Sequence, residues 1–476
     1  VVVLAPDDDA RARESLSAAL DVPRLVDVLR PFRVVDDLNV VVRADAENPQ
    51  RALSVRALEV RFKSDSGATS ATRDDAEARG RDAVASECFD VSTMTDDTCG
   101  RARRETGDAC VRRARTEAET SGRFEKFFDA NERATAFNEC EAFDHALGAI
   151  LCVRAGKSSY EDVLQSFEDL KQQFLRLPVF ATGGADPETC FGKVLVWDAR
   201  DGATTKEEAE ALLQRVRQTG AWDCELLTLN SDLEGTCASG VDWNEHRETV
   251  ISRAAAERAG VANEASKTMG RYMSLEDVDR AKTYVRVFVT KTLLPHMERK
   301  LFALSTQIYN TRKGLRNQFK TFWGRSTATA TAHRDGEQGH RSPEGQIRLA
   351  GDLAFMLGDY DTALANFKLV HSDYKSQSAW KRLASSYEAM AHVYVTTRHL
   401  RNKADLKKDI NHAYDSAMTS LLKYETIGGV GDLHLAHVEM LKARSAVEHA
   451  KALTAIGAYR EAHAPLVSAS AFVHSD

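Results

Sequence analysis

Two short motifs in this 476-residue chain contain residue types that could do chemistry, and neither motif is complete. Gly156, Lys157 and Ser158 have the order that ends a phosphate-binding loop, whose backbone amides cradle a phosphate group. That loop also needs a glycine five positions before Gly156, where this chain has Leu151. The three residues therefore predict a polar turn after a helix and not a nucleotide site.

His434 and His437 lie three residues apart, a spacing that would put both imidazoles on one face of a helix. No glutamate-bearing zinc motif surrounds them, and the sequence offers no obvious third ligand. No serine lies in a Gly-x-Ser-x-Gly turn, and the carboxylates are scattered along the chain. The sequence therefore predicts no catalytic residue, no metal and no cofactor.

The eight cysteines are also expected to be free and reduced. No two of them have the two-to-four-residue gap of a zinc knuckle. The even spacing of Cys88, Cys99 and Cys110 falls in a polar stretch with few large apolar residues. Free thiols of a reducing compartment fit this usage best.

One segment stands out by its charge. Residues 299–334 contain eight arginines and lysines and no acidic residue, in a chain whose formal net charge is -7. On a helical wheel Leu315, Phe319 and Phe322 share one face with Ile308, and Trp323 lies at its margin. The sequence predicts a basic amphipathic helix with aromatic side chains on its apolar face.

Three interpretations of this helix stay open. Its apolar face packs into the core of the protein, or it contacts an anionic membrane, or its charges bind RNA or another acidic partner. A segment with four apolar and four basic residues can gain on the order of 10 kcal/mol at an anionic bilayer before the ordering cost, enough for reversible peripheral binding. The residues predicted to contact the membrane are Arg312, Lys313, Leu315, Arg316, Phe319, Lys320, Phe322 and Trp323.

Composition sets the frame for these motifs. Apolar residues make up 43% and charged residues 28% of the chain, a globular balance, and the length suggests about three domains. The pI of about 6.1 argues against a surface built throughout for nucleic acid, and no nucleic-acid partner is expected. No apolar run approaches the ~18 residues that span a bilayer.

Residues 1–240 are predicted to form an α/β domain. Helices are expected at 10–20, 23–29, 163–175 and 206–218 and within 124–153, and strands at 1–4, 40–42, 58–63, 193–197 and 225–229. Strand, helix and strand over 193–229 resemble a parallel βαβ unit, with a capping box at Thr204 or Thr205. Residues 64–122 contain too few large apolar residues to fold and are predicted to be a disordered insertion.

The second half of the chain is predicted to be helical. A linker at 241–272 precedes a helical segment at 273–325, which Pro295 should kink, and a second linker covers 326–345. Residues 346–476 are predicted to form a solenoid like that of tetratricopeptide (TPR) repeats, packed through Gly358, Tyr360, Ala363 and Phe367. Gly457 repeats Gly358 after 99 residues, close to three repeats of ~34. The expected fold class is therefore α+β and multidomain.

Several stretches resemble the TRAPP complex 85-kDa-subunit family. They are Phe-Val-Thr-Lys-Thr-Leu-Leu-Pro-His-Met-Glu-Arg-Lys at 288–300, Thr-Arg-Lys-Gly-Leu-Arg at 311–316, Phe-Trp-Gly at 322–324, Gly-Gln-Ile-Arg-Leu-Ala-Gly-Asp-Leu-Ala-Phe-Met at 345–356, and Leu-Leu-Thr-Leu-Asn-Ser at 226–231. The likeness covers most of the chain and is weak across 64–122. Because the chain lacks an initiating Met and opens inside a strand-like run, it is expected to be a fragment without its true N-terminus. The resemblance implies that a β-rich C-terminal part is also missing, since the chain ends inside the predicted solenoid.

The resemblance implies a non-catalytic subunit of the TRAPP III tethering complex, which as a whole is a guanine-nucleotide exchange factor for a Rab-family GTPase. It implies that the subunit directs the shared TRAPP core to its membrane in ER–Golgi traffic and autophagy. The implied partners are other TRAPP subunits, indirectly the GTPase, and an anionic membrane surface. The implied location is cytoplasmic and peripheral to Golgi, ER–Golgi intermediate and autophagosome-forming membranes. An RNA-binding scaffold and an enzyme housed in the α/β domain remain the alternatives.

Overall fold

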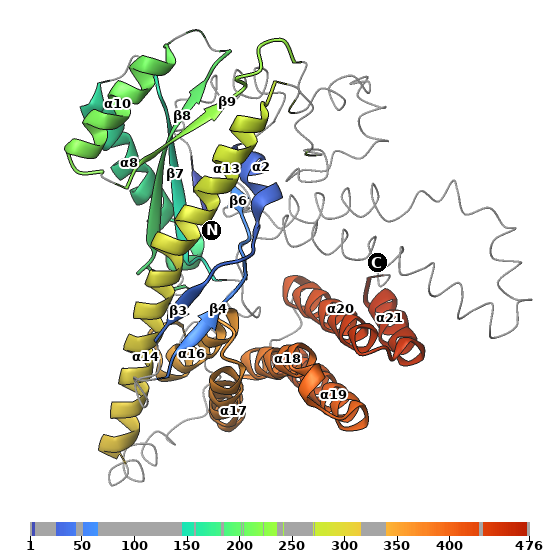
Figure 1. The fold of residues 1–476 in the computed structure, drawn as a ribbon. Helices are drawn as coiled ribbons and strands as arrows, with labels where there is room; N and C mark the ends of the chain where they lie inside the picture. Colours follow the sequence, from blue (N-terminus) through green and yellow to red (C-terminus); the bar gives the residue numbers. More distant parts are fainter. Residues whose placement is uncertain are drawn as a thin grey trace, which may run out of the picture.

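The computed structural model describes residues 2–4, 25–43, 51–64, 145–235, 241, 270–315, 339–427 and 432–473, apart from gaps at 157–158, 182–184, 201, 203, 222 and 271. The described chain is mixed α/β, with a parallel sheet and a helical C-terminal region (Figure 1). The predicted helix at 10–20 and the predicted insertion at 64–122, except Ser64, lie outside the described residues.

The sheet has five parallel strands in the order β6-β1-β7-β8-β9. The strands are β1 (Val2–Leu4), β6 (Lys63–Ser64), β7 (Gly148–Arg154), β8 (Cys190–Asp198) and β9 (Glu225–Leu229). Counted along the chain this order is 2-1-3-4-5, that of flavodoxin-like doubly wound sheets. In such sheets the carboxyl ends of the strands form the edge where ligands bind, so this edge is where an enzyme site would be sought.

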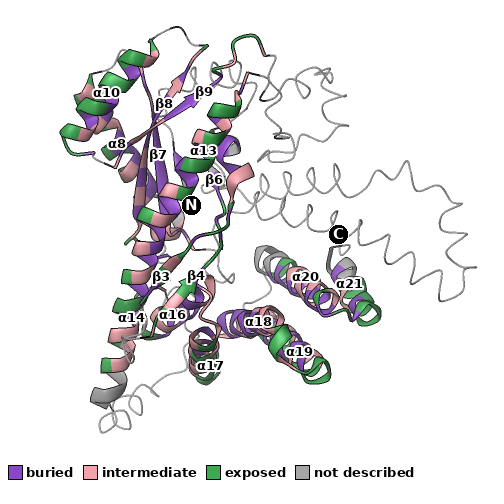
Figure 2. Cartoon of the chain, viewed as in Figure 1, coloured by how far each residue is buried: buried purple, intermediate pink, exposed green. Residues whose placement is uncertain are grey.

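Strand β7 corrects one prediction. The apolar run at 146–153 was expected to end a long helix, and it forms the central strand instead. All its residues from Gly148 to Val153 are buried, because helices cover both faces of the sheet (Figure 2). A continuous apolar run has no period, so it does not distinguish a buried strand from a buried helix.

Helices α8 (Tyr160–Leu175) and α10 (Lys206–Gln218) pack together against one face of the sheet. Each begins with a reciprocal capping box, from Ser159 with Asp162 and from Thr205 with Glu208. The predicted parallel unit of β8, α10 and β9 is confirmed, and Thr205 rather than Thr204 caps its helix. A short helix, α9 (Pro178–Ala181), follows α8.

Residues 25–43 and 51–59 cover the other face of the sheet. Helix α2 (Leu25–Leu29) and a 3₁₀ turn (Arg30–Phe32) lead into two antiparallel pairs, β2 (Val34–Val35) with β5 (Leu58–Glu59) and β3 (Val40–Val42) with β4 (Leu53–Val55). The single strand predicted at 58–63 is wrong. Its alternating burial holds through Phe62, but β5 and β6 belong to different sheets.

A long helical rod runs from the sheet to the C-terminal helices (Figure 1). It consists of α13 (Leu275–Phe288), a π-helical turn (Val289–Leu293) and α14 (Leu294–Leu315). In the π turn the N–H of Leu294 donates to the carbonyl of Val289, five residues earlier. The wider turn directly precedes Pro295, which cannot donate to the carbonyl four residues back. It also keeps the apolar face continuous, since buried Phe288 is followed by buried Leu293.

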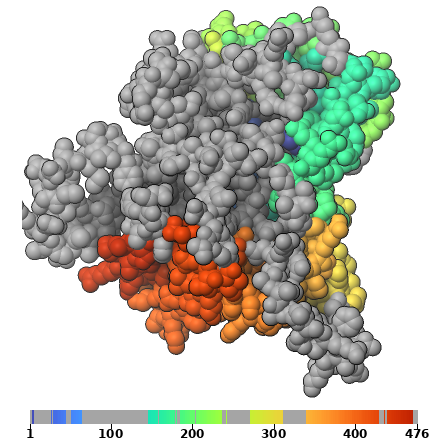
Figure 3. All heavy atoms as spheres, turned by 180° about the vertical axis from the view of Figure 1, so that it is seen from behind, coloured from blue at the N-terminus to red at the C-terminus, as the bar shows by residue number. Residues whose placement is uncertain are grey.

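Six helices form the C-terminal region, in three consecutive pairs. They are α16 (Pro343–Met356), α17 (Tyr360–Ser376), α18 (Trp380–Thr396), α19 (Lys403–Ile427), α20 (Asp432–Ala455) and α21 (Tyr459–Val473). Seen from behind, they gather at one end of the molecule, opposite the helices of the sheet (Figure 3). Helix α16 begins inside the predicted linker, with Ser342 as its cap, because Pro343 favours a first helical turn.

The distance along the chain between Gly358 and Gly457 does not come from a 34-residue repeat. Gly358 follows α16, the first helix of the first pair, and Gly457 follows α20, the first helix of the third pair. The 99 residues between them therefore span two helix pairs and not three repeats. Gly358 is also not a close-approach site, since an added Cβ would meet no atom within 4 Å. Its φ of +85° is what favours glycine there, as at a helix C-terminus.

One apolar core joins the two halves of the molecule. It runs from Phe62 under the sheet through Met297 on α14 to Leu353 and Phe367 on α16 and α17. Gly351 allows this packing, because a Cβ there would lie 2.6 Å from the ring of Phe367. The first pair of C-terminal helices therefore packs as part of the core that also includes the sheet.

Candidate membrane segment, polar sites and relatives

The predicted membrane-contact residues lie at and beyond the end of α14. Arg312, Lys313 and Leu315 are in its last turn, where the structure describes the backbone and not the side chains. Arg316, Phe319, Lys320, Phe322 and Trp323 lie outside the described residues. The segment thus extends from a helix that is anchored in the core.

The first part of the apolar face of α14 is buried. Leu301 and Leu304 belong to the main core, and Ile308 is half-buried against it. Spacings of three and four residues keep these positions on one face, in line with Leu315. Ile308, the first residue of the predicted stripe, therefore contacts the protein itself, whereas Phe302 on the opposite face is 42% exposed beside exposed Arg299.

The residues predicted to pack the solenoid lie at the α16–α17 turn. Ala363 and Phe367 are fully buried on α17, and Tyr360 is half-buried with its ring edge-on to that of Phe355. Asp359 caps α17 and forms an ion pair, 2.7 Å long, with Arg51 from the loop before β4. This turn therefore joins the helical region to the N-terminal residues.

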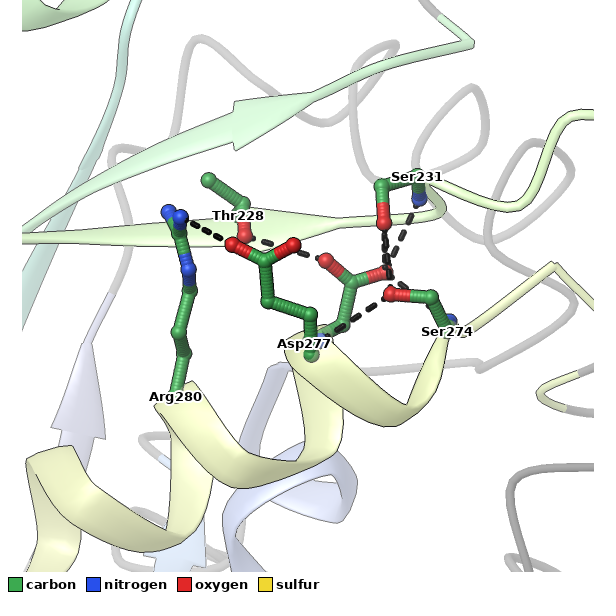
Figure 4. A network of polar contacts seen from close by, with 6 residues as sticks. Thr228, Ser231, Ser274, Asp277 and Arg280 are labelled. Carbon is green, nitrogen blue, oxygen red and sulfur yellow. Dashed lines mark hydrogen bonds and ion pairs between the residues drawn. The ribbon is translucent and has the colours of Figure 1, made fainter.

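The carboxyl edge of the sheet holds a polar network that the sequence did not reveal (Figure 4). Asp277, fully buried on α13, accepts from the hydroxyl of Thr228 at 3.0 Å and from the N–H of Ser231 at 2.9 Å. It also accepts from the Ser231 hydroxyl and from the N–H of Ser274, whose hydroxyl accepts from the Asp277 N–H. The carboxylate thereby fixes the start of α13 to the end of β9.

A second buried pair lies on the same edge. Asn230, directly after β9 with a φ of +57°, donates from Nδ2 to Oδ1 of Asp198, the last residue of β8, at 3.0 Å. The N–H of Arg200 donates to the same oxygen. Asp198 Oδ2 and Asn230 Oδ1 have no hydrogen-bond partner among the residues that the structure describes. The pair ties two strand ends together.

This arrangement does not assemble an enzyme site from the described residues. Among the described residues, the hydroxyl of Ser231 contacts Asp277 and Ser274 and no histidine. Gly156 follows β7 rather than a helix, which corrects that expectation, and Lys157 and Ser158 fall outside the description. His434 and His437 are on α20 with undescribed side chains. Within the described ranges no cluster suited to a metal ion occurs.

The strongest pKa shifts belong to groups in the core. Burial raises the pKa of Cys190 to about 11 and that of Cys224 to about 12, and it raises the pKa of Cys152 further. All three are free cysteines, so they are protonated thiols and poor nucleophiles. Burial lowers the pKa of His296 on α14 to about 4, with Lys300 and Arg299 adding to the effect.

Charged groups buried at the junction of sheet and helices are paired. The imidazole of His145, just before β7, lies 2.6 Å from Oδ2 of Asp352 on α16, and Arg348 binds the same carboxylate at 3.0 Å. Lys300 forms an ion pair with Asp186 before β8 at 3.0 Å. These pairs position α14 and α16 against the sheet.

Comparisons with known proteins match a family and a human relative. The model of the family described as the ER–Golgi trafficking TRAPP I complex 85 kDa subunit matches residues 7–457. Human trafficking protein particle complex subunit 8 is 29% identical over 132 residues, which cover 26% of this chain and 9% of the human protein. The matched stretch is thus a small part of that relative.

The described helices include none that is both long enough and apolar enough to span a bilayer. The description of the matched family refers to ER–Golgi trafficking and to the TRAPP complex. The chain belongs to the family of the 85-kDa subunit of the TRAPP complex.

Proposed function

We propose that this chain is a non-catalytic subunit that directs a TRAPP core to membranes. The assembly would be TRAPP III, a vesicle-tethering complex with exchange activity toward a Rab-family GTPase, acting in ER–Golgi traffic and autophagy. The family match over 7–457 is the observation that carries this proposal. Exchange chemistry would reside in other subunits of the complex.

The helical C-terminal region supports a role in protein contacts. Its three consecutive helix pairs present long helix faces, and such stacked pairs commonly serve as scaffolds. A TPR-like solenoid is part of the proposal, with irregular pair lengths in place of a strict 34-residue period. The other TRAPP subunits are the proposed partners of these faces.

The membrane contact is assigned to residues 312–323. Anchoring of α14 through Leu301 and Leu304 would hold the base of this segment on the protein while its basic and aromatic residues meet an anionic leaflet. The proposed location is accordingly peripheral to Golgi, ER–Golgi intermediate and autophagosome-forming membranes.

Two measurements test the proposal. A pull-down from cytosol should recover small TRAPP subunits, and recovery of none would contradict the subunit assignment. Cosedimentation with anionic vesicles should be lost in Phe319→Asp with Phe322→Asp while the thermal melt is unchanged. An unfolded double variant would show instead that the segment packs in the core.

A further inference from the structure

The turn between α18 and α19 combines an exposed leucine with exposed cations. Leu400, in the 3₁₀ turn Arg398–Leu400, is 75% exposed, more than any other large apolar side chain in the described ranges. Arg398 and His399 before it and Lys403 after it are exposed as well. An isolated exposed leucine is ordinary, whereas one set among cations is a distinct surface.

The charge of this turn is only partly neutralised. Arg401 pairs with Asp409 at 2.8 Å, and its guanidinium lies 4.6 Å from the centre of the Tyr394 ring. Arg398 donates to the carbonyl of Val395 in its own helix at 3.1 Å. Within the described chain no ion pair engages Arg398 or Lys403. Their charges therefore remain available to a partner.

The turn between α20 and α21 lies beside it. Nζ of Lys403 is 3.4 Å from the place that a Cβ would take at Gly457, and Lys407 forms an ion pair with Glu461. Tyr459 at this second turn is 63% exposed. The two turns thus make one surface, here called the basic turn surface, which consists of Arg398, His399, Leu400, Lys403, Tyr459 and Arg460. Exposed Asp405 and Glu461 border it, and Glu461 is paired with Lys407.

We propose that the basic turn surface is a second contact of this chain with an anionic lipid surface. A leucine at the tip of a turn can enter a bilayer interface without a matching pocket, and a tyrosine prefers the headgroup level. The flanking Arg398 and Lys403 meet the negative potential of the leaflet. The inference rests on the proposed membrane role but uses residues independent of the α14 segment.

The chain contains a natural control for this surface. Leu233, in the loop after β9, is 64% exposed and lies between Asp232 and Glu234. It matches Leu400 in type and exposure but has acidic neighbours, which an anionic leaflet repels. A purely hydrophobic effect would treat the two leucines alike, whereas a lipid contact at the basic turn surface distinguishes them.

The test measures partitioning of the full chain onto phosphatidylcholine vesicles with and without phosphatidylserine. Leu400→Asp is expected to lower binding to the anionic vesicles about tenfold, since it removes the burial of one leucine and adds a repelled charge. Arg398→Glu with Lys403→Glu should lower it by a similar factor at low salt and less at high salt. Leu233→Asp should leave binding unchanged, and thermal melts of all variants should coincide.

Each outcome has a separate meaning. If Leu400→Asp binds as the unaltered chain while Phe319→Asp with Phe322→Asp does not bind, the second contact is wrong and the proposed function stands. If no variant changes binding, both fail. If soluble polyglutamate binds the surface as tightly as the vesicles and is lost in the same variants, the partner is an acidic protein and the lipid assignment is overturned.

Discussion

The carboxyl edge of the sheet and the basic turn surface are both rich in polar residues, yet they use them in opposite ways. At the sheet edge Asp277 is buried and accepts from four donors on two elements. At the turn Arg398 and Lys403 are exposed and engage no carboxylate in the described chain. Polar groups that bond to one another position elements, while charges left in water are free to meet something outside the protein.

Predictions that test this contrast begin with the largest effect on stability. Asp352→Ala should lower the free energy of unfolding by about 3–5 kcal/mol, because it leaves buried Arg348 without its carboxylate and also removes the contact of His145. Urea denaturation measures the change. Exposed Asp361, on the neighbouring helix, is the control, and an equally small loss for both variants would contradict the structural role of the pair.

Asp277→Ala should lower the free energy of unfolding by about 1–3 kcal/mol, because it leaves the buried hydroxyl of Thr228 without its acceptor and removes the bonds to Ser231 and Ser274. The matched control is Asp279→Ala, two residues further along α13 on its exposed side. If a spectroscopic melt shows the same midpoint for both variants, the network does not hold α13 in place.

Acidification should lower the free energy of unfolding through buried His296. The pKa of His296 falls to about 4 in the folded chain because of burial, below the usual value near 6.5. The neutral form is favoured by folding, so this stability is present above about pH 6.5 and is lost as the pH falls toward 4, by about 2 kcal/mol. His296→Gln should flatten this acid limb in unfolding free energies measured across that range, and an unchanged limb would contradict the assignment.

The smallest effect is expected at the turn. Leu400→Asp and Arg398→Glu should each change the free energy of unfolding by less than about 0.5 kcal/mol, because neither side chain packs in the core. Calorimetric melts check this. A drop comparable to that of Asp277→Ala would show that the turn is a structural feature and would remove the contrast.

The sequence predicted best where period and capping agreed. Helix α10 follows from its helical spacing and a capping box at Thr204 or Thr205, and the short apolar runs on either side of it predict strands β8 and β9. Strand β7 was missed because an uninterrupted apolar run lacks a period. The glycines at 358 and 457 suggested a fixed repeat, but helices α19 and α20, of 25 and 24 residues, stretch the spacing.

Site residues were harder to predict for a related reason. Asp277 is 49 residues from Thr228, and no local pattern joins them. His145 and Asp352 are 207 residues apart, and neither lies in a recognisable motif. The basic turn surface did carry a signal, Arg-His-Leu-Arg at 398–401, but only the fold shows that Leu400 is exposed and that the turn of Tyr459 lies beside it.

The π turn at 289–293 sets the direction in which the rod presents its faces. One residue of an α-helix corresponds to about 100° of rotation. If the same residues formed a regular α-helix without the wider turn, every later residue of α14 would turn by about that angle relative to α13. Leu301 and Leu304 would then leave the core and Arg299 would turn toward it. The extra residue in this turn thus sets the rotation of α14 about its axis relative to α13. It thereby determines which side of α14 faces the protein where the basic segment begins.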